Sequence, residues 1–413
     1  MSHYKPYPAY RDSGVEWIGQ VPSKWEVKPI KIVATFNDDV LPDSTAADTP
    51  ISYVDISSVS YAAGIGSTEE MLFGNAPSRA RRKAKVGDVV ISTVRTYLKA
   101  VAAVDAAHAD CVYSTGFAVL RSRTGHIEPN FLKWLALNEL FIQSVESHSE
   151  GLSYPAINAP ELVNLKTVMP SLPEQATIAV TIDRETARFD ALIAKKTRFI
   201  ELLKEKRQAL ITHAVTKGLN PKAKMKASGV EWIGEVPEHW VAIKFNHVAR
   251  VTEGLVDPKA HPYREMVLIA PNHIESGTGK ILGLETAVFQ NAESGKYTCK
   301  KGAVIYSKIR PALAKVAIAP CDCLCSADMY PMDCTDRTYP EWLFYLMLSP
   351  PFTSWAILES DRVAMPKINR ESLADLRVFL PPMDEQLAAV AWLKAQVEKL
   401  EIVSLKTQHS IDL

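Results

Sequence analysis

The spacing of apolar and polar residues along the chain predicts an alternation of short strands and helices. Short apolar runs at Val89–Val94 and Val304–Ile309 follow glycine-containing turns, which is typical of β-strands. Phe131–Leu140 and Trp342–Leu348 have the composition of helices that pack on a core. The expected fold class is therefore α+β, built from mixed α/β domains.

A much longer helix is predicted between residues 174 and 217, because this stretch contains neither proline nor glycine. Pro173 suits a first helical position, Glu174 suits the positive end of the helix dipole, and Gly218 is a plausible end. About 42 residues at 1.5 Å each extend roughly 60 Å. Apolar pairs recur between charged residues at Leu192/Ile193, Phe199/Ile200, Leu202/Leu203 and Leu210/Ile211. This stripe favours coiled-coil-like packing against another helix over a charged helix surrounded by solvent.

The chain also repeats itself. The segment SGVEWIGQVPSKW (Ser13–Trp25) returns as SGVEWIGEVPEHW (Ser228–Trp240), with 10 of 13 positions identical at an offset of 215. At the same offset, GDVVISTVRTYLKAVA from Gly87 matches GAVIYSKIRPALAKVA from Gly302. YPAINAPELVNLKTVMPSLPEQ from Tyr154 matches MPKINRESLADLRVFLPPMDEQ at an offset of 211. A unit this long is no solenoid repeat, so we predict two copies of one domain in pseudo-two-fold tandem.

The repeats set the expected order of segments along the chain. Each globule is followed by a long helix that begins at LPEQ or MDEQ, and the two helices are expected to run antiparallel. We predict a first domain with its entry segment at residues 1–172, a spacer helix at 173–218, a second domain at 219–382, and a shortened distal helix at 383–413.

Composition and charge then exclude several classes of protein. The 413 residues carry 47 Lys and Arg against 47 Asp and Glu, so a polybasic nucleic-acid coat is excluded and any DNA surface must be local. No apolar run approaches the roughly 18 residues that a membrane span needs, and no secretory signal is visible, so a cytoplasmic location is expected. Six cysteines are too few for a disulfide framework and fit a reducing compartment.

Together these motifs resemble the specificity subunit of a type I restriction–modification system. The resemblance is carried by the paired SGVEWIG-x-VP-x-x-W segments, the GDVVISTVRTYL and GAVIYSKIRPAL blocks, and the LPEQ and MDEQ helix starts, and it covers essentially the whole chain. It implies two target-recognition domains that each read one half of a split DNA sequence, separated by long antiparallel coiled-coil-like helices.

The resemblance also implies partners in a prokaryotic cytoplasm. These are double-stranded DNA, two adenine-methyltransferase subunits docked on the helical regions, and restriction subunits with translocase and nuclease activity. The chain itself is expected to be non-catalytic and to bind no cofactor, whereas S-adenosylmethionine, ATP and Mg²⁺ are implied for the partner subunits. Leu192, Phe199, Leu203 and Leu210 are the candidate residues for partner docking.

Candidate DNA contacts come from local clusters of basic residues. RARRKAK holds five cations in seven residues and is expected in a loop that neutralises phosphates, although it could also be a solvated loop: Arg79, Arg81, Arg82, Lys83 and Lys85. Arg95 and Arg310 end equivalent strands and could reach base edges, or could instead pair with a carboxylate. Lys99, Lys308 and Lys315 lie close to them in the sequence.

Short motifs in the second half of the chain also suggest a catalytic loop and a metal site. Ser349–Phe352 (SPPF) matches the catalytic loop of amino-methyltransferases, which would make the chain a self-contained DNA adenine methyltransferase. The first copy has no such motif, so we expect SPPF to end one helix and start another. Cys321–Cys325 (CDCLC) lacks the usual zinc spacing, and no metal site is expected. A stand-alone sequence-specific DNA-binding regulator is the other alternative.

The two copies differ at the end of their helices. At the 211 offset, Leu413 corresponds to Leu202, so the second helix has no counterpart of residues 203–219. We therefore expect a truncated, incomplete helical region with weaker methyltransferase docking on that side, or self-association. The residues expected to lose part of their partner and stay exposed are Leu203, Leu210, Ile211 and Val215. Alternatively, the segment before Ser13 could cover them.

Overall fold

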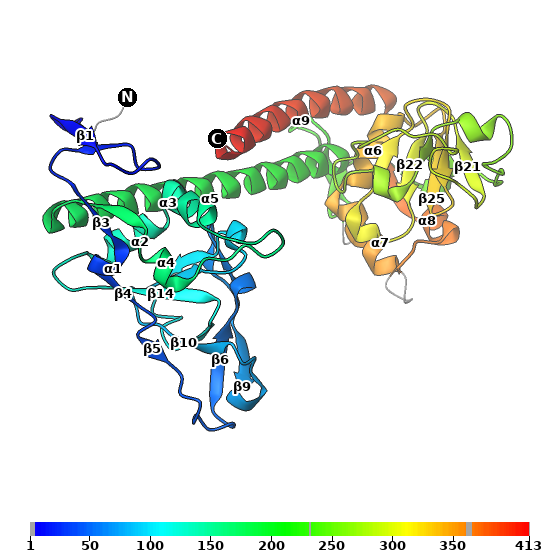
Figure 1. The fold of residues 1–413 in the computed structure, drawn as a ribbon. Helices are drawn as coiled ribbons and strands as arrows, with labels where there is room; N and C mark the ends of the chain where they lie inside the picture. Colours follow the sequence, from blue (N-terminus) through cyan, green and yellow to red (C-terminus); the bar gives the residue numbers. More distant parts are fainter. Residues whose placement is uncertain (1–4, 231–232, 361–365, 413) are drawn as a thin grey trace. The chain divides into compact units, whose positions relative to one another are not determined.

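The computed structural model describes residues 5–230, 233–360 and 366–412 (Figure 1). Glu231 and Trp232 of the second SGVEWIG motif, Met365 at the start of the third repeated block, and Leu413 lie outside the described residues. Contacts between residues divide the chain into a first unit, Met1–Ala191, and a second unit, Leu192–Leu413. The boundary falls within one continuous helix, α5 (Leu172–Lys217), so each unit contains part of that helix.

Each unit contains a four-stranded antiparallel sheet with the same strand order. In the first unit the order is β12 (Val101–Ala103), β11 (Val89–Ser92), β14 (Phe117–Ser122) and β4 (Ala34–Phe36). In the second unit it is β23 (Val316–Ile318), β22 (Val304–Ser307), β25 (Met329–Cys334) and β19 (Ala249–Val251). All residues of β11 and β22 are buried, which explains their unbroken apolar runs. Both predicted strands are confirmed and end two residues earlier than expected.

A second, mixed sheet is also repeated, but with different surroundings. In the first unit its order is β5 (Asp39–Val40), β10 (Ala80–Lys83), β13 (Val112–Ser114), β6 (Pro50–Val54) and β9 (Glu69–Leu72). In the second unit it is β20 (Leu268–Ile269), β24 (Cys323–Ser326) and β21 (Lys296–Cys299). In both, one parallel pair adjoins an antiparallel neighbour. The units therefore share a central arrangement and differ at its edges.

Short antiparallel pairs complete each unit. In the first unit these are β1 (Tyr10–Asp12) with β2 (Gln20–Pro22), β3 (Glu26–Pro29) with β15 (Lys166–Met169), and β7 (Val59–Ser60) with β8 (Gly64–Ile65). In the second unit they are β16 (Met225–Ala227) with β17 (Glu235–Pro237), and β18 (Val241–Lys244) with β26 (Arg377–Leu380). Because β3 pairs with β15 and β18 pairs with β26, the first and last strands of each globule lie side by side.

The shorter helices follow the same duplicated order. The first unit has α1 (Ile30–Val33), α2 (Pro129–Ala136), α3 (Glu139–Ser147) and α4 (Ala159–Leu162). The second has α6 (Pro340–Leu348), α7 (Pro350–Ser360) and α8 (Arg370–Asp375), which are followed by the long helix α9 (Met383–Asp412). The predicted helix at 342–348 is confirmed. The one predicted at 131–140 is wrong at its end, because Asn138 accepts hydrogen bonds from the next backbone N–H groups and starts α3.

Both long helices are confirmed. Helix α5 has 46 residues, and Gly218 follows it with a φ of +70°, the left-handed conformation that commonly ends a helix. Within the second unit, α9 runs antiparallel to the last part of α5 (Figure 1). The Lys196 ammonium donates a hydrogen bond of 2.8 Å to the backbone oxygen of Ser410, whereas Ile211 and Leu393 share a core near the other end of the pair.

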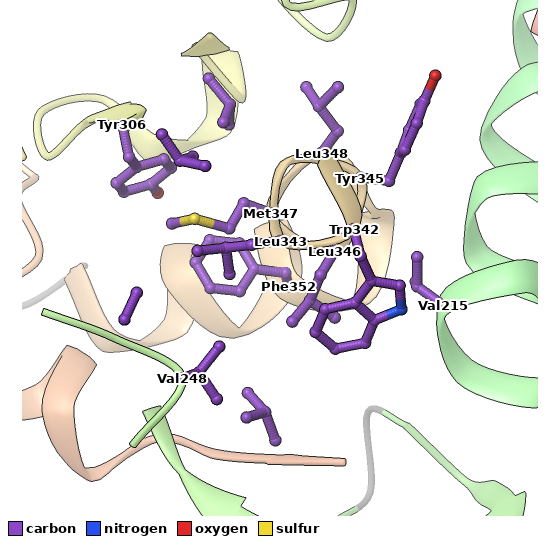
Figure 2. Packing of buried hydrophobic residues seen from close by; sticks show 14 of the residues in the cluster. Val215, Val248, Tyr306, Trp342, Leu343, Tyr345, Leu346, Met347, Leu348 and Phe352 are labelled. Atoms are coloured by element: carbon purple, nitrogen blue, oxygen red, sulfur yellow. The ribbon is translucent and has the colours of Figure 1, made fainter. Parts of the chain in front are cut away.

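The largest core of the second unit includes the end of α5. Ile211 and Val215 are 0% and 2% exposed, and Val215 lies beside the Trp342 indole (Figure 2). Leu203 is 9% exposed and Leu210 is partly buried. The expectation that these four α5 residues stay exposed is therefore wrong. Leu210, Ile211 and Val215 pack in or against the main core of the second domain, so they do not depend on a longer α9 for burial.

A buried glutamine occupies the same position at the start of α5 and α9. Gln386, 0% exposed, accepts a 2.8 Å hydrogen bond from the backbone N–H of Tyr339. Its amide group donates to the backbone oxygens of Arg337 (2.8 Å) and Pro381 (2.9 Å). Gln175 joins the start of α5 to the start of α2 in the corresponding way. This explains the glutamine in LPEQ and MDEQ, which fastens the long helix to its globule.

We expect Gln386→Ala to lower the free energy of unfolding by about 2–3 kcal/mol, because it leaves buried backbone groups without partners. Urea titration followed by circular dichroism measures this. Gln408→Ala, on the exposed surface of the same helix, is the matched control and should change stability by less than about 0.5 kcal/mol. Equal effects of the two substitutions would contradict the assigned role of Gln386.

Candidate nucleic-acid interface

A turn with an unusual backbone follows the central strand of the four-stranded sheet in both units. The two turns, which we call the arginine turns, comprise residues 95–99 and 310–314. Each is built around a short 3₁₀ helix, η3 (Thr96–Leu98) or η7 (Pro311–Leu313). The two turns share this geometry because they follow equivalent strands: β11 pairs with β14 in the first sheet as β22 pairs with β25 in the second.

Both ends of each arginine turn have left-handed backbone conformations. The φ angles are +51° at Arg95, +49° at Lys99, +49° at Arg310 and +43° at Ala314. A residue with a β-carbon pays roughly 1–3 kcal/mol for such a conformation. Strain repeated at equivalent positions of two divergent domains is a recognised feature of binding sites. The turns are therefore the strongest candidate site in each unit.

Buried hydroxyl groups and facing segments hold the arginine turns in place. The Ser92 and Ser307 hydroxyl groups donate to the backbone oxygens two residues further on. Isolated β-bridges then pair Val94 with Ala156 and Ile309 with Lys367. These two bridges correspond at the repeat offsets, so each turn is fixed against the segment that precedes α4 or α8.

The guanidinium-bearing residues of the turns are exposed to solvent. Arg95 and Arg310 are both exposed. The Arg95 guanidinium carbon lies 4.9 Å from the centre of the Tyr154 ring, and Tyr97 and Tyr154 are 54% and 65% exposed. A cation beside exposed aromatic rings can contact both the phosphates and the bases of a nucleic acid. The sequence did not single out these tyrosines, because they come from segments 57 residues apart that only the fold brings together.

The second unit carries a different cation–aromatic cluster near its turn. The Lys308 ammonium lies 5.3 Å from the centre of the Tyr330 ring. The Arg370 guanidinium lies 5.6 Å from the centres of Tyr330 and Tyr297 and forms an ion pair of 3.1 Å with Glu253. Arg370 was not predicted from the sequence, because it follows the repeated MPKIN segment with no surrounding basic cluster.

The predicted basic loop at Arg79–Lys85 is wrong. Ala80–Lys83 forms strand β10 within the five-stranded sheet. The side chains of three cations are paired with carboxylates of the same unit: Arg79 with Asp55 (3.0 Å), Arg81 with Asp43 (3.4 Å) and Lys85 with Asp39 (3.5 Å). Burial lowers the pKa of Arg82, and Lys83 remains exposed. Three of the five positive charges that we predicted to contact DNA are therefore paired with carboxylates of their own domain.

The two remaining candidate lysines are also engaged within their units. The Lys99 ammonium donates a 2.6 Å hydrogen bond to Glu139, and this contact raises the pKa of Lys99. The Lys315 ammonium donates a 2.6 Å hydrogen bond to the backbone oxygen of Pro271. Among the predicted cations near the turns, Arg95 and Arg310 are therefore the two that occupy equivalent positions and are exposed to solvent.

The methyltransferase-like motif SPPF is buried. As expected, it connects α6 to α7. Ser349 is 0% exposed and donates its hydroxyl hydrogen to the backbone oxygen of Leu346. Phe352 is also 0% exposed and lies within the core, next to Tyr306 (Figure 2). A catalytic loop that holds a flipped base needs open access. This segment therefore offers no adenine site.

Two of the three cysteines of CDCLC, Cys323 and Cys325, belong to strand β24, and Cys321 precedes it. Cys323 and Cys325 are fully buried in β24, and Cys299 lies opposite Cys323 on β21. Burial raises the pKa of the Cys334 thiol to about 12. Within the described ranges, no three His, Cys, Asp or Glu side chains are grouped to hold a metal ion. These thiols are free and pack within or beside apolar cores.

The four predicted docking residues of α5 fall into two groups. Leu192 and Phe199 are 46% and 44% exposed, whereas Leu203 is buried and Leu210 is partly buried within the second unit. Leu192 and Phe199 are therefore the two candidates whose side chains are open to a partner. In the part of the chain that the structure describes, none of the helices combines the length and apolar composition needed to cross a bilayer.

Comparison with known proteins connects this architecture to a family. Residues 237–411 match the type I restriction modification DNA specificity domain. The chain is 34% identical over 284 residues to the EcoDI specificity subunit of a type I restriction enzyme from Escherichia coli, covering 64% of this chain and 63% of that subunit. The chain is similar to the specificity subunits of type I restriction–modification systems. The expectation drawn from the repeated motifs is thereby confirmed.

Solved structures support the fold along the length of the chain. A chain from a structure concerned with complex assembly and conformational transition of the type I R-M system has a TM-score of 0.68 at 21% identity, covering 95% of both chains. The HsdS subunit from Thermoanaerobacter tengcongensis has a TM-score of 0.57 at 23% identity, covering 95% of this chain and 94% of that one. The α+β fold class with strand-rich domains and a long helix is confirmed.

Proposed function

We propose that this chain recognises DNA for a type I restriction–modification complex, and that each unit reads one half of a bipartite site. The observation that carries the proposal is the pair of strained, exposed arginine turns at equivalent positions. Similarity to the specificity domain supports a role in DNA specificity, and the repeated turn supports two equivalent contacts to one duplex.

Comparison of the two units suggests how the contacts divide between backbone and bases. An arginine present in both copies is suited to what both half-sites share, which is the phosphate backbone. Side chains that differ between copies are suited to what differs, which is the base sequence. Tyr97 and Tyr154 in the first unit, and the cluster around Arg370 in the second, are our candidates for the second group.

We further propose that the chain is non-catalytic and acts with partners in the prokaryotic cytoplasm, where its DNA would be found. Two methyltransferase subunits would dock on the helical regions, with Leu192 and Phe199 as candidate contacts, and restriction subunits would join that core. S-adenosylmethionine, ATP and Mg²⁺ would be bound by those partners. The burial of SPPF argues against a self-contained methyltransferase, and the zero net charge argues against a stand-alone regulator that binds DNA tightly by itself.

A domain exchange tests the proposal. Residues 26–170 should be replaced by the equivalent segment of another specificity subunit, since β3 and β15 close this globule at its base. After assembly with methyltransferase subunits, sequencing of methylated DNA should show one half-site changed and the other half-site and the spacer preserved.

The matched control is the exchange of residues 241–380, which β18 and β26 close in the same way. It should change only the other half-site. Altered specificity in both half-sites after either exchange, or in neither half-site, would contradict the division of recognition between the two units.

A further inference from the structure

The first unit contains an open groove along the first part of α5. It has a volume of about 1220 Å³ and lies between the segments that flank the β1–β2 hairpin and one face of the helix. Trp25, Ile178, Ile182 and Thr186 line it and are only half-buried, and Phe189 at its end is 63% exposed. The Trp25 indole N–H is buried and has no hydrogen-bond partner among the described residues. We call this feature the first-unit groove.

The repeat shows what happens to the same surface in the second unit. Trp25 corresponds to Trp240 at the offset of 215. At the offset of 211, Ile178, Ile182 and Thr186 correspond to Ala389, Leu393 and Val397. These residues are 2%, 3%, 1% and 7% exposed. The surface that is open in the first unit is therefore covered in the second.

The covering segment in the second unit is the end of α5. Ile211, Ala214 and Val215 belong to the same buried core as Leu393. A β-carbon on Gly218 would lie 3.2 Å from the Trp240 ring, so the helix end lies directly against this tryptophan. The occupant is thus an amphipathic helix with Ile, Ala and Val at positions i, i+3 and i+4, followed by a glycine.

We propose that the first-unit groove binds an amphipathic helix of a partner protein, with a face like that of residues 203–219. Because the two units share strand order and motifs, a helix that fits one surface has the shape to fit the other. The carboxylates that line the groove already have partners, since Glu174 accepts a 2.6 Å hydrogen bond from Tyr7 and Glu185 pairs with Arg184 at 2.8 Å. The apolar wall is therefore the surface that the helix would contact. The proposal does not depend on DNA recognition.

A peptide of residues 203–219, LKEKRQALITHAVTKGL, is the probe. Calorimetric titration into the full chain should show saturable one-to-one binding. Ile182→Glu should weaken binding at least about tenfold, because it places a charge on the apolar wall. Thr181→Trp should do the same by filling the groove, without a buried charge that could impair folding. Circular dichroism establishes that each variant is folded.

Val180→Glu is the matched control, since Val180 lies on the same helix but is 63% exposed and outside the groove. Peptide with Ile211→Glu should not bind. Absence of binding by the natural peptide, or binding that survives both groove substitutions, would overturn the proposal. So would a concentration-dependent dimer that Ile182→Glu abolishes, because the groove would then join two copies of this chain.

Discussion

Replacing Arg95 and Arg310 together by glycine should lower the affinity of the assembled complex for its DNA site by about 100-fold or more. A charge-assisted hydrogen bond contributes roughly 1.5–3 kcal/mol, and each 1.4 kcal/mol is a tenfold change in Kd. Each single substitution should cost about 10- to 100-fold. If the arginines contact phosphates, the dependence of log affinity on log salt should become shallower by about one for each arginine lost. Fluorescence anisotropy with labelled duplex at several salt concentrations measures both quantities.

Glycine separates binding from folding in this experiment. It adopts the left-handed backbone without penalty, so relief of strain at Arg95 offsets the lost contact with the Tyr154 ring. The free energy of unfolding should therefore stay within about 1 kcal/mol of that of the natural chain. A large loss of stability, or unchanged DNA affinity in the double variant, would assign the turns a structural role only.

Lys99→Gly is the matched control in the same turn. Lys99 has the same left-handed backbone, but its ammonium is paired with Glu139. The second copy has Ala314 at this position, so a charge here is not common to the two turns. We expect less than about a threefold change in DNA affinity. A loss as large as that of Arg95→Gly would mean that charge anywhere in the turn suffices.

Ile211→Ala and Phe199→Ala lie on one helix but should affect different properties, the first the stability of the chain and the second its assembly with a partner. Ile211 is 0% exposed, so its truncation should lower the free energy of unfolding by about 2–5 kcal/mol. Phe199 is 44% exposed, so its truncation should change stability little. If α5 is the docking surface for methyltransferase subunits, Phe199→Ala should weaken their assembly about tenfold, as loss of an aromatic interface residue commonly does.

Urea titration measures the first quantity, and light scattering after mixing with methyltransferase subunits measures the second. Arg198→Ala, next to Phe199 on the exposed part of the helix, is the control for a general disturbance of that surface. If Phe199→Ala and Arg198→Ala weaken assembly equally, the apolar contact is not what holds the partner. If Ile211→Ala leaves stability unchanged, the end of α5 is not part of the core of the second unit.

The sequence by itself determined the duplication, the long helices and the resemblance to type I specificity subunits. These features depend on local or linear information: identical residues at offsets of 215 and 211, a stretch without proline or glycine, and fully apolar runs at Val89 and Val304. Buried strands and uninterrupted helices have characteristic patterns, because burial and backbone hydrogen bonding constrain every residue in them. The sequence also shows the LPEQ and MDEQ motifs, but it does not predict the hydrogen bonds that Gln175 and Gln386 form with backbone groups.

Only the tertiary structure decided which charges and which apolar residues are free to act. The basic run at Arg79–Lys85 contains strand β10. Three cations in or beside this strand form ion pairs with Asp39, Asp43 and Asp55, which are distant in sequence. Leu203 and Ile211 belong to an apolar stripe of the helix pattern, yet they are 9% and 0% exposed, and Ile211 lies in the main core of the second unit. Periodicity states that one face of a helix is apolar but not which neighbour buries it, because that neighbour is selected by the packing of segments far apart in the chain.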